Sequence, residues 1–320
     1  MLNTTRHRLA AAPTPMAGLA LGVASLGWCW ENTGLFAGQT QDLGAAIAAG
    51  LLLILSAKFL LHPRLLAEDL AHPVVGSVVP TFAMATMVVS AALEGVAREA
   101  LWLLAIGLHG AFLLAFVGHR LKAFRLHHMV PSWFVPPVGI VVAAVTSPGG
   151  ALAPLAQGLM WFGLGCYGLL LPLMLYRLLF CAALPDAARP TLAILAAPAS
   201  LSLAGYLTVI ARPDPLLVAV LLGIAVLMTA LVYLALFRLL RLPFSPGFAA
   251  FTFPLVIGAT ALFKVAGLAA GLGLDGSPLA RLAQLELVVA TLVVGYVALR
   301  YALHLTALGR LLAPARQPAQ

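Results

Sequence analysis

Apolar runs long enough to cross a lipid bilayer follow one another along almost the entire chain. A bilayer core of about 30 Å is crossed by roughly 20 apolar residues in a helix. The 320 residues are 62% hydrophobic and only 9% charged, and their mean hydropathy is +1.05. Water-soluble domains of this size do not have such a composition. The sequence therefore predicts an all-α integral membrane protein.

Ten membrane spans can be placed on these runs. They are 15–30, 43–61, 74–93, 101–118, 132–146, 152–175, 191–210, 215–237, 248–268 and 278–304. We predict a single transmembrane domain over 1–320, with about 12–310 in the membrane and short tails at 1–11 and 311–320. The N-terminal apolar run is interpreted as the first span rather than as a cleaved signal segment.

The basic residues predict the orientation of the chain. An even number of spans puts both termini on one side, and that side has Arg6, Arg8, Lys58, Arg64, Arg120, Lys122, Arg125, Arg177, Arg189, Arg238, Arg241, Arg300, Arg310 and Arg316. The opposite side has only Arg98, Arg212 and Arg281. Because cytoplasmic loops carry the excess of Lys and Arg, both termini are predicted to be cytoplasmic. The same rule accounts for the net charge of +8 without nucleic acid as a partner.

Prolines recur in every second predicted span. Pro80, Pro136, Pro198 and Pro254 lie in the third, fifth, seventh and ninth spans, about 60 residues apart. An interior proline removes a backbone hydrogen bond and kinks the helix, and broken backbone at membrane depth must contact protein or water. We therefore predict five helical hairpins. Their kinked odd-numbered helices form an inner ring around a pore, and their even-numbered helices form an outer ring against lipid.

Small and hydroxyl-bearing residues mark the predicted wall of this pore. They are Ser77, Thr81, Gly139, Ser200, Ser202, Gly205, Thr252 and Gly258. Small residues also occupy close helix–helix contacts in membranes, so tight packing without a pore is the alternative interpretation. The proline pattern favours the pore.

Two side chains of the ninth span are candidates for control of the pore. Phe253 is a bulky ring beside Pro254, and such a ring can close a narrow pore by occlusion or dewetting. Packing of the ring between helices is an equal alternative. Lys264, further along the same span, either supplies positive potential at the outer mouth or extends to the membrane interface.

Catalytic and metal-binding signatures are absent from the sequence, which has no H-E-x-x-H, no G-x-S-x-G, no P-loop and no metal-spaced Cys/His cluster. We therefore expect neither an enzyme nor a cofactor or metal. Few ionisable residues lie at membrane depth, and Glu286 in the last span is expected to pair with Arg281. The lack of paired carboxylates along the predicted axis favours passive permeation over proton- or sodium-coupled pumping.

Four segments carry recognisable motifs. They are LLAEDLAHPVVGSVV (65–79), PSWFVPPVGIVVAA (131–144), RPTLAILAAPASLSLAGY (189–206) and PFSPGFAAFTFPLVIGATALFK (243–264). With their HP, P-x-W-F-x-P and T-F-P motifs, they resemble the tellurite-resistance/dicarboxylate transporter family. This family includes bacterial TehA-like proteins and the slow-type anion channels of plant guard cells. The resemblance covers all ten predicted spans in order.

The resemblance implies a ring of five helical hairpins around a central pore in each protomer of a homotrimer, in a bacterial inner membrane. It also implies anion permeation and, through the T-F-P motif, a gate at Phe253. Family members differ in substrate, which can be chloride, nitrate, C4-dicarboxylates, tellurite or sulfite. We therefore expect a passive channel for small anions. A secondary transporter for C4-dicarboxylates or an exporter of oxyanions such as tellurite or sulfite is the alternative, and a non-conducting scaffold is a third class.

Overall fold

The computed structural model describes the backbone of residues 2–311 and the side chains of residues 6–306. Within that range the chain forms α-helices and short 3-10 helices, and no strand. The α-helices are α1 (Leu2–Ala10), α2 (Met16–Trp30), α3 (Gln39–Leu61), α4 (Pro63–Ala71), α5 (Val75–Val78), α6 (Thr81–Ser90), α7 (Gly95–Lys122), α8 (Val135–Val138), α9 (Val142–Val145), α10 (Ala153–Phe180), α11 (Ala197–Val209), α12 (Pro215–Leu239), α13 (Phe253–Gly271) and α14 (Ser277–Leu311). The 3-10 helices are η1 (Glu31–Thr33), η2 (Leu126–His128), η3 (Pro131–Phe134), η4 (Gly139–Val141), η5 (Gly150–Leu152), η6 (Asp186–Ala196) and η7 (Pro246–Phe251). The predicted tail at 311–320 lies outside the described residues, apart from the backbone of Leu311.

The number of full-length spans is smaller than predicted. Among the described residues, seven helices are long and apolar enough to cross a membrane. The chain bends by 107° between the helices Pro63–Ala71 and Val75–Ser90. If this bent pair is counted as one span, the number of crossings is eight. The apolar segment Pro131–Val145 is shorter than a full span, and α2 has only 15 residues. The protein is therefore an integral membrane protein with continuous long helices and several short or broken ones, not ten uniform spans.

Burial separates the helices into two groups. Protein covers 72% of the apolar stretch of Asp186–Val209 and 61% of that of Pro246–Gly271. The corresponding values are 28% for α7, 22% for the helix that contains α10, and 28% for α12. The odd-numbered segments 191–210 and 248–268 of the sequence prediction are thus interior, whereas the neighbouring even-numbered helices turn large apolar side chains outward. These include Leu114, Leu169 and Leu234, each more than two-thirds exposed.

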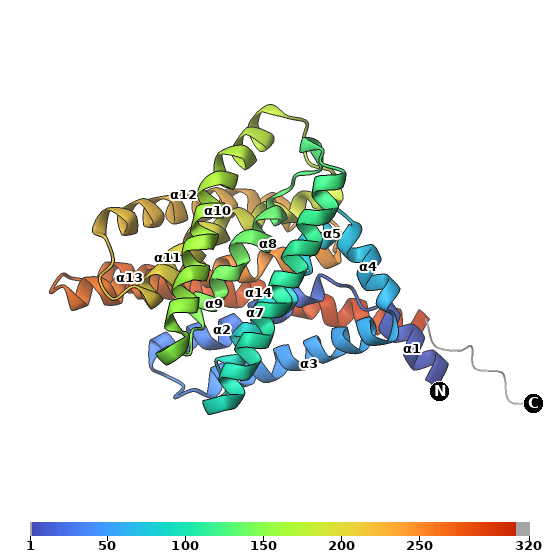
Figure 1. Cartoon of the computed structure of the whole chain (residues 1–320), viewed down its shortest axis with the longest axis horizontal. Coiled ribbons are helices and arrows are strands. Elements are labelled where there is room, and N and C mark those ends of the chain that lie inside the picture. The colour runs from blue at the N-terminus through green and yellow to red at the C-terminus, as the bar shows by residue number, and fades with distance from the viewer. Residues whose placement is uncertain (1, 312–320) are drawn as a thin grey trace, which may run out of the picture.

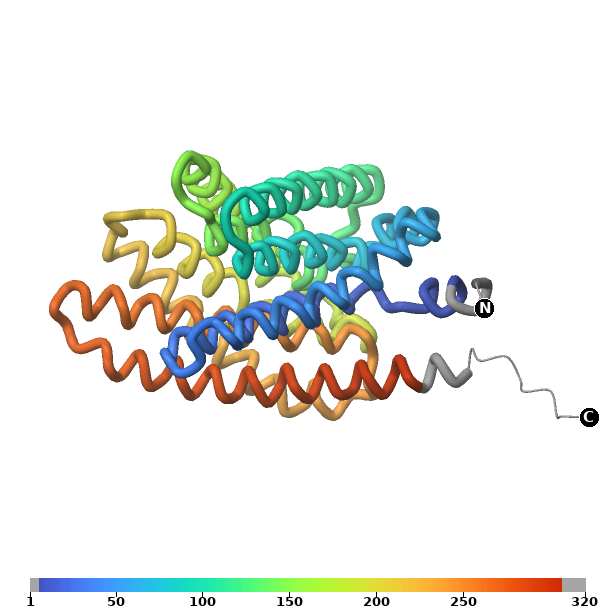
Figure 2. The backbone as a smooth tube through the Cα atoms, turned by 90° about the horizontal axis from the view of Figure 1, so that it is seen from below, coloured from blue at the N-terminus to red at the C-terminus, as the bar shows by residue number. Residues whose placement is uncertain are grey.

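The interior segments contact one another in chain order and close a ring. α2 contacts α6, α6 contacts α9, α9 contacts α11, α11 contacts α13, and α13 contacts α2 again. The longer helices pack on this ring in the same order: α3 packs on α2, α7 on α6, α10 on α8 and α9, α12 on α11, and α14 on α13. In both Figure 1 and Figure 2, α1 and the C-terminal part of α14 lie at the same end of the molecule.

The four periodic prolines lie at breaks between helices. Pro80 directly precedes α6, and Pro136, Pro198 and Pro254 lie in the first turns of α8, α11 and α13. The first N–H groups of a helix have no partner within the helix, so a proline is tolerated there. Interior segments such as Asp186–Val209 and Pro246–Gly271 nevertheless continue through their prolines. The interior kinks predicted from the sequence are therefore breaks in α-helical structure, at which an α-helix begins directly after a 3-10 helix or turn.

Three buried basic side chains join outer helices to the segments that precede the interior ones in the chain. Each donates to a backbone carbonyl: Lys58 to Ala12 (2.9 Å), Arg120 to Ala71, and Arg177 to Leu126 (3.1 Å). A buried cation is stable only when its donors are satisfied. The repeated contact therefore fixes where an interior segment begins relative to its outer helix.

Candidate functional site: two cavities separated by Phe253

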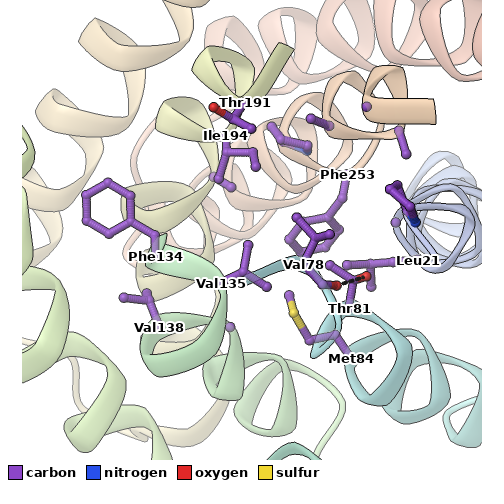
Figure 3. Close-up of a pocket in the computed structure, with 18 of the residues that line it drawn as sticks. Leu21, Val78, Thr81, Met84, Phe134, Val135, Val138, Thr191, Ile194 and Phe253 are labelled. Atoms are coloured by element: carbon purple, nitrogen blue, oxygen red, sulfur yellow. Dashed lines mark hydrogen bonds between the residues drawn. The ribbon is translucent and has the colours of Figure 1, made fainter. Parts of the chain in front are cut away.

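A cavity of about 100 Å³ lies inside the ring, and we call it the first cavity. Every interior segment contributes to its wall: Leu21 comes from α2, Met84 from α6, Val138 from α8, Ile194 from η6 and Phe253 from α13 (Figure 3). Nearly all of the lining surface is apolar. The first cavity therefore lies on the axis that the interior segments share.

A second cavity of about 80 Å³ is bordered by α2, α6, α9, α11 and α13. It is more polar than the first, because Ser25, Asn32 and Thr260 line it. Lys264 is the only charged side chain among its lining residues. The predicted outer-mouth charge therefore borders a space inside the ring, although part of the Lys264 side chain remains exposed.

Phe253 lies between these two cavities. It lines both of them, as does Leu201, and it is 7% exposed. Figure 3 shows its ring directed into the first cavity beside Val78 and Thr81. The neighbouring Phe251 is fully buried and packs on Phe248, with 4.8 Å between ring centroids. Of the two phenylalanines, only Phe253 lines a cavity within the ring.

Three helices of eight residues or more begin at the first cavity. Thr81 is the first residue of α6, Ala197 of α11 and Phe253 of α13, and all three residues line this cavity. The N-terminal end of a helix carries a partial positive charge from its aligned peptide dipoles, and it favours anions. The starts of these three helices therefore favour an anion at the centre of the ring.

Two of the eight predicted pore-lining residues, Thr81 and Gly139, line the first cavity. The Thr81 hydroxyl donates to the carbonyl of Val78 (2.6 Å), which holds it against its own chain. A Cβ atom at Gly139 would lie 2.6 Å from Sδ of Met84. Glycine at 139 therefore leaves room for a methionine that also lines the cavity.

The other six predicted pore-lining residues lie elsewhere. Ser200 and Gly258 line a third cavity, described below. The remaining four are in contacts inside the protein: Ser77 Oγ lies 2.6 Å from Ser132 Oγ, Thr252 donates to the Gly18 carbonyl (3.1 Å), a Cβ on Gly205 would lie 2.6 Å from Val141, and Ser202 is fully buried. The contacts of these four residues fit the alternative interpretation, in which small and hydroxyl-bearing residues allow helices to pack closely.

The lining residues that sequence reasoning missed are aliphatic. Leu21, Val78, Val135 and Leu201 line the cavities, yet they look like the core residues that surround them. One signal was available for three of them, because Val78, Val135 and Leu201 lie close in sequence to a periodic proline. A break turns the side chains next to it toward the shared axis.

Of the periodic prolines, Pro198 and Pro254 themselves line the first cavity. The carbonyl of Pro136 faces outward and accepts a hydrogen bond from Nε2 of the fully buried His109 (2.8 Å). His109 thus satisfies one of the backbone groups freed by the break at 136. In the described part of the chain, no group of three or more His, Cys, Asp and Glu side chains is arranged to hold a metal ion.

Comparisons with known proteins agree with this architecture. A family model described as voltage-dependent anion channel matches residues 16–302. Two uncharacterized transporters of Methanocaldococcus jannaschii are each 26% identical to the chain, over 217 and 226 residues. The alignments cover 58% and 61% of this chain but only 62% and 65% of those relatives. Because the family model spans α2 to α14, and therefore the whole ring, the chain belongs to the voltage-dependent anion channel family.

Proposed function

We propose that the protein is a passive channel for small anions, which cross the membrane along the axis of the ring. Phe253 closes this route, because its bulky ring lines both the first and the second cavity, together with Leu201. This shared lining is the observation on which the proposal depends. If the side chain moves or is truncated, the two spaces become one continuous passage.

The preference for anions rests on the charges around the axis. The N-terminal ends of α6, α11 and α13 meet at the first cavity, and Lys264 borders the second. No Asp or Glu is among the residues that line either cavity. An anion on the axis therefore experiences positive potential and no facing carboxylate, whereas a cation is disfavoured.

The arrangement in the membrane is part of the same proposal. The interior segments and their outer partners form five hairpins that cross the membrane ten times, with both termini in the cytoplasm of a bacterial cell. The exposed apolar side chains of the outer helices contact lipid and the neighbouring subunits of a homotrimer. Chloride or nitrate is the proposed substrate, with C4-dicarboxylates and oxyanions such as tellurite or sulfite as alternatives.

The two relatives are described as uncharacterized transporters, so a coupled transporter is the second function to test. Proteoliposomes with equal chloride on both sides and an imposed pH gradient distinguish the two. A passive channel produces no net chloride accumulation under these conditions when the membrane potential is clamped at zero. Accumulation driven by the pH gradient would show a coupled transporter and contradict the proposal.

Replacement of Lys264 tests its role at the second cavity. Lys264→Gln is expected to lower the anion current roughly two- to fivefold at low ionic strength, and less at high salt, because the lost charge is screened there. Lys264→Arg, which keeps the charge, is the matched control. Both are measured as bilayer currents in a Phe253→Ala background. Equal currents from the Gln and Arg forms at low salt would mean that Lys264 extends to the interface instead.

A further inference from the structure

A third cavity of about 170 Å³ lies outside the ring axis, between α11, α12, α13 and α14. The carboxyl group of Glu286, on α14, borders it together with Thr229 and Tyr233 of α12. Glu286 is only 6% exposed, and its Oε1 atom has no hydrogen-bond partner among the described residues. The Tyr233 hydroxyl is likewise buried without a partner there. A carboxyl group thus lies at membrane depth beside a mostly apolar cavity that is large enough for water and that also contains the hydroxyl groups of Ser200, Thr229 and Tyr233.

The helix that carries Phe253 has a glycine at the position where it passes this carboxyl group. Gly258 of α13 also lines the cavity, and a Cβ atom at this position would lie 2.9 Å from Oε1 of Glu286. Gly258 is about one and a half turns beyond Phe253 on the same helix. Glycine at 258, predicted from the sequence to line the pore, therefore makes room for Glu286 instead.

The groups that face Glu286 provide no positive charge. Tyr233 faces it from α12 and Cys29 from α2, and both are neutral near pH 7. From α11, the Ser200 hydroxyl donates to its own helix, to the carbonyl of Ala196 (3.0 Å). No Lys, Arg or His is among the residues that line the cavity. Arg281, the partner predicted from the sequence, is exposed and forms no ion pair with Glu286 in the described part of the chain.

An ionised carboxylate that no cation faces is unstable at membrane depth, even beside a neutral hydroxyl donor such as that of Tyr233. A neutral carboxylic acid carries no such penalty, and its O–H can donate to a cavity water or to a facing hydroxyl oxygen. We propose that Glu286 is a proton-binding site, occupied near pH 7, and that loss of its proton loosens the packing of α13 against α14. The link from this site to the movement of Phe253 rests on the proposed channel function.

Infrared spectroscopy of the reconstituted full chain tests the site directly. The wild type is expected to show the carbonyl band of a protonated carboxylic acid near pH 7, and Glu286→Gln is expected to lose it. Glu99→Gln, which changes an exposed carboxylate on α7, should leave the band in place. In Tyr233→Phe the band should persist at a shifted position, so the site remains testable if Glu286→Gln folds poorly.

Three results would overturn the proton site. The first is a spectrum of the wild type near pH 7 without the acid band. The second is a band unaffected by Glu286→Gln in folded protein. The third is loss of the band when sodium chloride replaces choline chloride, because the cavity would then be a cation site.

The consequence for α13 has its own readout. As the pH rises from about 6 to about 9, ionisation should lower the melting temperature of the wild type by a few degrees relative to Glu286→Gln, because only the wild type gains a buried charge. Anion flux should rise over the same range in the wild type and stay flat in the variant. If the acid band titrates but both proteins melt and conduct alike, the link to α13 is wrong and the proton site stands. If neither protein conducts, the channel function fails while the band still decides the site.

Discussion

A Phe253→Ala variant is expected to conduct anions at least roughly tenfold better than the unmodified protein. Alanine removes the ring that lines both cavities, so only Leu201 remains common to their walls. The expected effect follows the volume of the side chain. Phe253→Leu should conduct at an intermediate level, and Phe253→Trp no better than the wild type. Current per reconstituted protein in planar bilayers is the measurement.

The control for this series is Phe237→Ala. Phe237 is 73% exposed on α12, on the outside of the ring, so its truncation should leave the current unchanged. Removal of a buried phenylalanine also costs stability, up to about 3–5 kcal/mol in a filled core. Melting temperatures of the Phe253 variants therefore accompany the currents. Equal currents from folded Phe253→Ala and wild-type protein would show that Phe253 packs between helices and does not close the route.

A Gly27→Ala variant is expected to lose its folded structure. Gly27 lies where α2 packs on α3, and a Cβ atom there would be 2.1 Å from the carbonyl oxygen of Thr40 and 3.1 Å from Cα of Gly44. Both neighbours are backbone, which cannot move aside as a flexible side chain can. Such overpacking should cost about 3 kcal/mol or more. The expected result is little monodisperse protein after extraction in mild detergent, and a strongly lowered melting temperature for what remains.

Gly107→Ala is the matched control for this substitution. Gly107 lies in α7, and a Cβ atom there would have no neighbour within 4 Å. Alanine also favours a helix over glycine, so the variant should be as stable as the wild type or slightly more so. If Gly27→Ala were as stable as Gly107→Ala, the close contact between α2 and α3 would not exist in the folded protein.

The sequence allowed the class of the protein and the position of its interior segments to be predicted. Hydropathy alone determined the membrane class. Pro198 and Pro254 then identified 191–210 and 248–268 as interior, because broken backbone in a membrane must be covered by protein or water. The same rule does not decide whether a proline kinks a continuous α-helix or marks the start of a new one. A proline fits an interior kink and a helix start equally well in sequence, and the choice depends on the neighbouring segments of the ring.

The lining of the cavities was predicted less well than the interior segments, for a physical reason. Hydroxyl groups and glycines occur both at water-filled surfaces and at close helix contacts. Ser77 and Thr252 proved to hydrogen-bond across segments, and Gly205 proved to pack against Val141, whereas aliphatic residues line most of the first cavity. Which face of a helix points to the axis is set by its tertiary contacts.

The third cavity was beyond the reach of sequence reasoning. Glu286 was expected to pair with Arg281, because the two are close in the chain. Its surroundings come instead from α11, α12 and α13, which are distant in sequence. The gate proposed at Phe253, by contrast, could be suggested from the sequence, because the bulky ring lies beside a periodic proline and belongs to the T-F-P motif.

The reversal potential of the Phe253→Ala current tests the central claim most directly, namely that anions pass along the axis of the ring. The measurement uses a planar bilayer with a tenfold gradient of potassium chloride across the reconstituted protein. We predict a reversal potential close to the chloride equilibrium potential, and an unchanged value when potassium is replaced by a larger cation. A reversal potential at zero or close to the potassium equilibrium potential would contradict the account.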